Sequence, residues 1–305
     1  MTEGYQALTK AAAVIDLSNR ARIRVSGEDR ARLLHALTTN HIQKLLPGHG
    51  CYAFFLSAQG RILADANLLI FPEHILIDSD PATRESLYAH IDHYIIADDV
   101  TLADETASTF CLGVEGPQAE SVLGRWMAPA PENDFAHAGW NDLAVARISW
   151  TGEPGYRLFG PVERKRAVEE ELYLPTASAE DAEIVRIEHG IARFGKEILP
   201  TTLPAETALD HAVHANKGCY IGQEIVERVR SRGHVNKRLV MLEVEGSRPR
   251  APGTRVFALG KDVGEITSAT FSPARNKIAA LGYVRVPHER QGSELEIEGD
   301  VARVL

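Results

Sequence analysis

The segment from Asn216 to Glu224, with the sequence NKGCYIGQE, brings a thiol, an amine and two glycines close together. Cys219 lies shortly before a stretch whose apolar spacing predicts a helix that ends at Gly233. The N-terminal end of a helix favours a thiolate, and Lys217 adds a positive charge nearby. We therefore take Cys219 as a candidate nucleophile and Lys217 as its partner. An isolated cysteine is also commonly a small buried hydrophobic residue, and that alternative stays open at this point.

The same stretch is basic. Residues 217–238 contain six Lys or Arg residues and two Glu residues, a local charge of +4 in a chain whose formal net charge is −9. A basic segment in an acidic protein indicates an anionic partner, either a carboxylated or phosphorylated ligand or a nucleic acid. For Arg228, Arg230 and Arg232 taken singly, a solvated helix face is the plainer explanation. The acidic balance of the whole chain argues against a dedicated DNA-binding protein.

The bulk composition is that of a soluble globular protein. Hydrophobic residues make up 44% and charged residues 25% of the 305-residue chain, which is long enough for about two domains. No apolar run approaches the length of a membrane span. Residues 1–5 show neither the basic nor the apolar region of a secretion signal. We expect a protein without membrane association, in the cytoplasm or in an organellar matrix.

Neither cysteine nor histidine spacing indicates a metal site. The cysteines are odd in number and far apart, which predicts no disulfide framework and no CxxC pair: Cys51, Cys111 and Cys219. The pairs His90/His93 and His211/His214 have helical ligand spacing but no third ligand such as a cysteine nearby. We therefore expect no metal. Gly-rich dinucleotide and P-loop motifs, HExxH and GxSxG are absent from the sequence, so nicotinamide, P-loop and hydrolase functions find no support.

Several elements can be predicted from local patterns. Ser26 and Asp29 form a capping-box pattern that predicts a helix over residues 29–37. Residues 52–71 read as a β-hairpin, and Asp65 falls in its second strand. A charged residue in a strand most often faces water, and it gains a function only if the strand lines a cavity.

Two predictions concern the second half of the chain. An apolar stripe over residues 184–194 predicts a helix that ends at Gly195. From Arg238 onward, short strands alternate with turns and no helical pattern intervenes, which predicts a small β-barrel or sandwich. We expect the boundary of this C-terminal domain near residue 237.

Short motifs along almost the whole chain resemble one superfamily, that of the glycine cleavage T-protein and its YgfZ-type relatives. The most specific motif is KGCYIGQE at 217–224, which is similar to the K-G-C-Y-x-G-Q-E signature of the YgfZ-type branch. The other matching segments are LTTN at 37–40, GRILAD at 60–65, TGEPGY at 151–156, RIEHG at 186–190, and VGEITS at 263–268 with Ser272-Pro273. The T-protein is a tetrahydrofolate-dependent aminomethyltransferase. Its YgfZ-type relatives are folate-binding proteins that support iron–sulfur cluster assembly or repair and, through it, tRNA-modifying enzymes.

The resemblance implies an α+β fold in a three-domain cloverleaf. Two α/β lobes with antiparallel sheets would surround a central folate cavity, and a small β-barrel would follow them. We accordingly expect residues 1–237 to form a T-protein-like folate-binding region of two interleaved lobes, and residues 238–305 to form the barrel.

The resemblance also implies a ligand and a set of site residues. The implied cofactor is tetrahydrofolate. Carried over motif by motif, the implied folate contacts are Asn40, Asp65, Tyr156, Arg186 and Tyr220. Arg186 would pair with a folate carboxylate through a bidentate contact. Catalytic roles would fall to Cys219, Lys217 and Asp65.

Two departures separate this chain from the true transferase. Ala64-Asp65 stands where the transferase has paired aspartates, and Arg157 stands where it has a glutamate that holds the pterin. A guanidinium has no acceptor for the pterin N–H groups.

Three functions follow as hypotheses. The first is a tetrahydrofolate-binding protein that maintains iron–sulfur enzymes, with iron–sulfur client or assembly proteins as partners. The second is an aminomethyltransferase of the glycine cleavage type. The third is a binding module in which residues 217–238 dock RNA or an acidic assembly partner.

Overall fold

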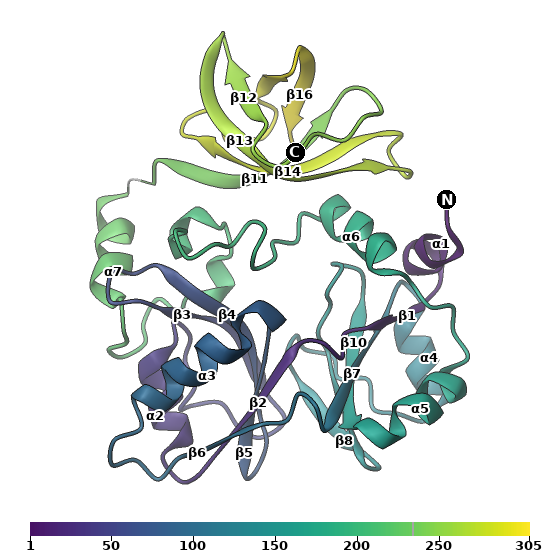
Figure 1. Cartoon of the computed structure of the whole chain (residues 1–305), viewed down its shortest axis with the longest axis vertical. Helices are drawn as coiled ribbons and strands as arrows, with labels where there is room; N and C mark the ends of the chain where they lie inside the picture. Colours follow the sequence, from purple (N-terminus) through teal and green to yellow (C-terminus); the bar gives the residue numbers. More distant parts are fainter. Residues whose placement is uncertain (234) are drawn as a thin grey trace.

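The computed structural model describes residues 1–233 and 235–305, which form two lobes below a β-barrel (Figure 1). The chain changes lobe early. Strand β1 (Ala13–Asp16) joins the sheet of the second lobe, whereas β2 (Ala21–Ser26) joins the sheet of the first. The two lobes are therefore interleaved in sequence. The short link between β1 and β2, residues 17–20, passes from the second lobe to the first.

The first lobe is a five-stranded antiparallel sheet in the order β3-β4-β5-β2-β6. Its apolar residues form one core with the two helices of the lobe. The further elements are β3 (Gly50–Leu56), β4 (Ile62–Ile70), β5 (His74–Ser79), β6 (Thr101–Asp104), α2 (Arg30–Leu37), the 3-10 turn η1 (Pro81–Thr83) and α3 (Arg84–His93).

The second lobe is a five-stranded sheet in the order β1-β7-β10-β9-β8, with separate apolar clusters on its two faces. One cluster includes residues of α1 and α6, and the other includes residues of α4 and α5. The elements are α1 (Glu3–Lys10), β7 (Thr109–Glu115), α4 (Ala119–Arg125), β8 (His137–Trp140), β9 (Leu143–Ala146), β10 (Gly155–Pro161), η2 (Val162–Arg164), α5 (Lys165–Leu172) and α6 (Ala179–Glu188).

A mostly irregular segment after α6 runs between the lobes and the barrel (Figure 1). It contains the 3-10 turns η3 (Pro204–Glu206) and η4 (Asp210–Ala212) and ends in α7 (Gln223–Arg232). The barrel is closed in the order β11-β14-β13-β12-β15-β16. Its strands are β11 (Lys237–Val244), β12 (Arg255–Ala258), β13 (Lys261–Ser272), β14 (Lys277–Arg285), β15 (Glu294–Ile297) and β16 (Asp300–Val304).

The architecture confirms the predicted α+β class with two antiparallel-sheet lobes and a C-terminal barrel. The predicted helix over 29–37 and the 52–71 hairpin are also present. Among the described residues, no helix has both the length and the apolar character needed to cross a bilayer.

Two local predictions were wrong. Ser26 does not cap α2, because it is the last residue of β2, and Asp29 accepts a hydrogen bond from the Asp99 backbone instead, at 2.9 Å. Helix α6 ends at Glu188 and not at Gly195. Gly190 follows with φ of 72°, a left-handed conformation that glycine adopts without strain and that stops a helix. The apolar residues after it line a cavity.

Candidate functional site

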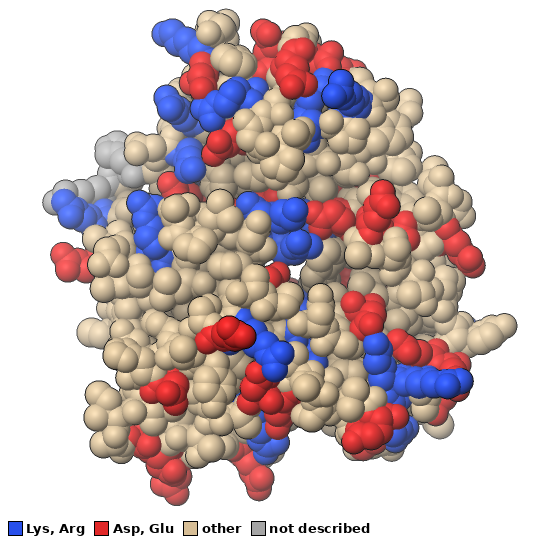
Figure 2. Space-filling model, in the orientation of Figure 1, with Lys and Arg blue, Asp and Glu red and all other residues tan. Residues whose placement is uncertain are grey.

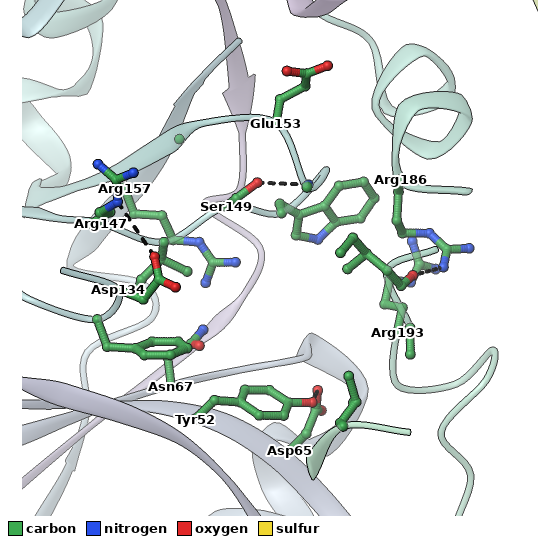
Figure 3. A pocket seen from close by; sticks show the side chains of 18 of the residues that line it. Tyr52, Asp65, Asn67, Asp134, Arg147, Ser149, Glu153, Arg157, Arg186 and Arg193 are labelled. Atoms are coloured by element: carbon green, nitrogen blue, oxygen red, sulfur yellow. Dashed lines mark hydrogen bonds and ion pairs between the residues drawn. The ribbon is translucent and has the colours of Figure 1, made fainter. Parts of the chain in front are cut away.

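A cavity of about 470 Å³ lies between the two lobes and the segment that follows α6 (Figure 3). This volume falls in the range of small-molecule sites, about 300–1,000 Å³. Its aromatic lining is spread over four parts of the chain: Tyr52, Phe135, Trp150 and Phe194. Figure 2 shows a hollow near the centre of the molecule with charged side chains beside it. The cavity can therefore enclose a flat, polar ligand.

Asp65 reaches the cavity because of the alternation of strand β4. Ala64 and Ala66 belong to the core of the first lobe, so Asp65 and Asn67 point to the opposite face, where the cavity lies. Asp65 Oδ2 accepts a hydrogen bond from the Tyr52 hydroxyl at 2.7 Å. Its Oδ1 is buried and has no hydrogen-bond partner among the described residues. Burial raises the pKa of Asp65, and the Tyr52 hydroxyl and Arg20 counter this only in part.

The floor of the cavity holds a buried charge cluster around Asp78. Its Oδ1 accepts from Arg20 Nε at 2.7 Å, and its Oδ2 accepts from Asn67 at 2.9 Å and from Arg157. Burial alone would raise the pKa of Asp78, but Arg157 and Arg20 hold it below its usual value. Arg157 is therefore a structural ion-pair partner, and it offers a ligand no acceptor.

The turn before β10 carries Trp150 into the cavity and is built around Glu115. This fully buried carboxylate accepts backbone hydrogen bonds from Trp150 at 2.6 Å and Thr151 at 2.9 Å. A Cβ on Gly155 would lie 2.8 Å from Glu115 Cγ, so the turn needs glycine there. No local motif identified Glu115, because its partners lie more than thirty residues away in sequence.

Arg186 lines the cavity, but its guanidinium is fully used by the protein. An arginine has five N–H donors, and here they bond to Glu183 twice, Glu197, the Ile191 carbonyl and Ser268. The predicted contact with a folate carboxylate would require some of these bonds to break.

Arg193 is better placed to meet an anionic ligand group. It lines the cavity, and its guanidinium carbon lies 5.7 Å from the centre of the Trp150 ring. Its Nη1 is 3.3 Å from Glu183, while its Nε has no partner within residues 1–233 and 235–305. The sequence pattern predicts a continuous helix through Arg193, but this residue lies in the irregular segment after α6. The pattern therefore does not indicate its position at the cavity.

Three other predicted folate contacts are not among the described residues that line the cavity: Asn40, Tyr156 and Tyr220. Asn40 lies just behind the lining and donates from Nδ2 to the carbonyls of Tyr52 and His211, both of which line the cavity. Tyr156 alternates with Arg157 along β10, so its ring packs in the core of the second lobe. Tyr220 is buried with Phe194 in another apolar cluster. Direct ligand contacts by these three residues stay predictions.

Lys217 holds the end of helix α2. Its Nζ donates to the carbonyls of His35 at 2.6 Å, Asn40 at 2.9 Å and Thr38. These three bonds use all the N–H groups of the ammonium, so none is left for the Cys219 thiol. Cys219 itself is exposed and lies three residues before Gly222, the N-cap of α7. The structure therefore places Cys219 at the surface and Asp65 in the cavity, in two separate locations.

The basic stretch is partly neutralised by its own neighbours. Arg230 contacts Glu227 at 3.1 Å and the Ala215 carbonyl at 3.0 Å, and Lys237 lies 4.5 Å from the Tyr283 ring centre. On the α7 side, Figure 2 shows basic and acidic side chains next to one another. The side chain of Arg232 and residue His234 lie outside the described part. An anionic partner at 217–238 stays a prediction.

Comparison with known protein families identifies the family of this chain. The GCVT N-terminal domain matches residues 1–217, and the glycine cleavage T-protein C-terminal barrel domain matches residues 237–304. The chain therefore belongs to the glycine cleavage T-protein family, as its fold and its central cavity indicate. Members of this family use tetrahydrofolate as substrate or cofactor, which agrees with the predicted ligand.

Individual relatives are aminomethyltransferases or proteins named as transferases. The aminomethyltransferase of Rubrobacter xylanophilus is 30% identical over 304 residues, covering 94% of this chain and 79% of the relative. A putative chloroplastic transferase of Arabidopsis thaliana is 28% identical over 314 residues, covering 99% and 72%. The crystal structure of aminomethyltransferase T from Bartonella henselae superposes with a TM-score of 0.91 at 23% identity, covering 99% and 87%, which supports the fold. The YgfZ-type assignment stays a prediction.

Proposed function

We propose that this protein binds tetrahydrofolate in the central cavity, with Asp65 as the acceptor for N–H groups of the reduced pterin. The observation that carries the proposal is the buried Oδ1 of Asp65, which has no hydrogen-bond partner in the part of the chain that the structure describes. The Asp65 side chain lines the cavity beside Tyr52. A buried polar atom without a partner is costly, and a ligand N–H removes that cost. Tyr52 fixes the carboxylate by bonding the other oxygen.

The remaining lining suits the other parts of a folate. Trp150 and Phe194 offer apolar faces to the rings, and Arg193 and Arg147 offer guanidinium groups to the glutamate carboxylates. Because Arg157 is bound to Asp78 and offers no acceptor, Asp65 takes over the pterin recognition that the resemblance assigns to a glutamate at position 157.

Trp150 provides a direct test of binding. Titration with tetrahydrofolate should quench the emission of Trp150, because the ligand would contact its ring. The other two tryptophans, Trp126 and Trp140, are stacked 5.2 Å apart in the second lobe and should not respond. The Trp150→Phe variant is the control, since it should lose the response while keeping the background emission. A response that persists in Trp150→Phe, or none in the native protein, contradicts binding in this cavity.

We further propose the YgfZ-type role, in which the folate-bound protein supports iron–sulfur cluster assembly or repair and thereby tRNA-modifying enzymes. The KGCYIGQE motif and the exposed Cys219 support this role, as does Arg157 in place of the glutamate. Cells that carry only Cys219→Ala should lose iron–sulfur enzyme activity while keeping normal amounts of the protein. Normal activity of the iron–sulfur enzymes in such cells would contradict the proposal.

Aminomethyl transfer of the glycine cleavage type is the second candidate. It is favoured by the curated relatives and by the position of Asp65 in the cavity. The deciding assay supplies an aminomethylated lipoyl carrier protein and tetrahydrofolate to the purified protein. Formation of methylenetetrahydrofolate would establish this activity, and its absence would leave the YgfZ-type role.

A further inference from the structure

Glu197 holds one wall of the cavity. The wall is the segment 190–194, in which five consecutive residues line the cavity. Glu197 is fully buried, and its Oε2 accepts from the Arg193 backbone N–H at 3.0 Å and from Arg186 Nη1 at 2.9 Å. Arg186 also donates to the Ile191 carbonyl at 2.5 Å. The backbone of the wall is thus fixed at two points by the Arg186–Glu197 ion pair.

The other oxygen of Glu197 is bound by the barrel. Its Oε1 accepts from Ser268 Oγ at 2.6 Å and lies 3.1 Å from Thr267 Oγ1. The Thr267 hydroxyl also lies 3.0 Å from the Leu281 carbonyl, so its single proton is divided between two acceptors, and Ser268 makes the stronger contact. Ser268 Oγ in turn accepts from Arg186 Nη2 at 3.2 Å. The Glu197 backbone carbonyl accepts from the Tyr283 hydroxyl at 3.0 Å. Glu197 therefore links the cavity wall to the barrel in two ways: its carboxylate is bound by strand β13, and its backbone carbonyl is bound by strand β14.

A β-bulge allows two consecutive barrel residues to reach the same carboxylate. Consecutive side chains of a regular strand point to opposite faces. The pairing of β13 with β14 shifts register between Ile266 and Ser268, so Thr267 is the extra residue of the bulge. Such bulges re-aim side chains next to functional sites. Here the bulge directs both hydroxyls at Glu197.

Apolar packing supports the same contact. Ala192, in the middle of the wall, packs with Met241 against the barrel residues Leu239, Leu281 and Tyr283. The wall therefore lies between the cavity on one side and the barrel on the other.

We propose that the barrel is a positioning element for ligand binding, and that it acts through Ser268 and Thr267 on Glu197. These hydroxyls hold the 190–194 wall, and with it Arg193, in the orientation that meets the ligand. Ligand affinity then depends on barrel residues that do not touch the ligand. Because coupling is reciprocal, an occupied cavity also strengthens the contact between wall and barrel. This inference rests on the proposed folate site.

The strand offers a matched control. Thr267→Val and Thr270→Val make the same chemical change three positions apart in β13. Thr270 Oγ1 lies 3.5 Å from the Phe271 carbonyl, and within the described part of the chain Glu197 is bonded by Thr267 and Ser268 and not by Thr270. Ser268→Ala removes the shorter bond to Glu197, so we expect it to have the largest effect.

Two measurements on the full-length variants test the proposal. Calorimetry with tetrahydrofolate should show affinity weakened about tenfold or more in Ser268→Ala and less in Thr267→Val, with Thr270→Val unchanged. Hydrogen exchange of the ligand-free proteins should show faster exchange in residues 191–197 of Ser268→Ala, with α2 amides unchanged, which separates local loosening from general loss of stability.

The outcomes separate this inference from the proposed function. Native affinity in Ser268→Ala and Thr267→Val, with unchanged exchange at 191–197, overturns the positioning role. A native protein that binds no tetrahydrofolate overturns the proposed function, and the exchange data then decide alone whether the barrel holds the wall. Faster exchange with native affinity also overturns the inference, because the wall would then be irrelevant to binding.

Discussion

Arg157 forms an ion pair with Asp78, and both side chains are almost completely buried on the floor of the cavity. Arg157 occupies the position in which the transferase motif has a glutamate. The guanidinium is thus directed at a carboxylate of the first lobe, and it connects the sheets of the two lobes through β10 and β5. We propose that recognition of the pterin falls to Asp65, on the neighbouring strand β4.

Removal of one partner from the Arg157–Asp78 pair should lower the free energy of unfolding strongly. Asp78→Asn would leave Arg157 and Arg20 buried without their charge partner, and breaking such a pair typically costs about 3–5 kcal/mol. The control is Glu170→Gln, which breaks the exposed Arg166–Glu170 pair and should cost under about 1 kcal/mol. Urea unfolding measures both. A cost for Asp78→Asn no larger than that for Glu170→Gln would contradict the structural role.

One thiol should react rapidly in the native protein. Cys219 is exposed, whereas Cys51 and Cys111 are buried, and burial raises the pKa of both buried thiols to about 12. Titration with a thiol reagent should therefore show one fast equivalent, which Cys219→Ala removes. The unfolding free energy of that variant should stay within about 0.5 kcal/mol of native, because the side chain is at the surface. A fast equivalent that survives in Cys219→Ala would contradict the assignment.

Asp65 should make stability fall as pH rises. Its pKa is raised in the folded state by burial, so the unfolded chain ionises first, near pH 3.9, and unfolding then releases a proton. Native stability is therefore lost from about pH 4 upward until the raised pKa is passed. The Asp65→Asn variant lacks this loss. The free energy of unfolding of the variant should therefore rise relative to that of the native protein as the pH increases over this window. Urea unfolding of the native protein and of Asp65→Asn between pH 4 and 8 measures this difference, and a difference that stays constant over that range would contradict the prediction.

Lys217 should matter for folding more than for thiol chemistry. Lys217→Met leaves the carbonyls at the end of α2 without their donor, and each unsatisfied buried group costs about 1–3 kcal/mol. We expect a clear loss of unfolding free energy, with the reaction rate of the Cys219 thiol changed less than twofold at a temperature where the variant is folded. A large drop in thiol reactivity without loss of stability would restore Lys217 as a partner of Cys219.

Patterns of local spacing predict individual strands and helices and the C-terminal β domain, whereas the arrangement of two lobes around a cavity follows from the family resemblance. The six strands after residue 237 and the hairpin with Asp65 follow from alternation and turn residues. Helix α1 was not predicted, although Thr2 caps it by accepting from the Tyr5 backbone at 3.2 Å. The capping signal is present, but the helix is short, and only three of its eight residues belong to the apolar cluster that it shares with α6.

The site was harder to predict, because its side chains are fixed by distant partners. The family motif predicts a ligand contact for Arg186, yet its donors bond to Glu197, eleven residues away, and to Ser268, 82 residues away. No local pattern contains those pairings. The family motif points to Asp65, and residue type, neighbours and motif together point to Cys219. Only the three-dimensional arrangement separates the cavity carboxylate from the surface thiol.

The most direct test is a calorimetric titration of the native protein with tetrahydrofolate, with Asp65→Asn and Asp134→Asn beside it. Both aspartates line the cavity, but of the two only Asp65 has a buried oxygen without a hydrogen-bond partner among the described residues. We expect saturable binding by the native protein, at least tenfold weaker binding by Asp65→Asn, and near-native binding by Asp134→Asn. No saturable binding by the native protein, or equal affinity in Asp65→Asn, would contradict the central claim that Asp65 receives a folate in this cavity.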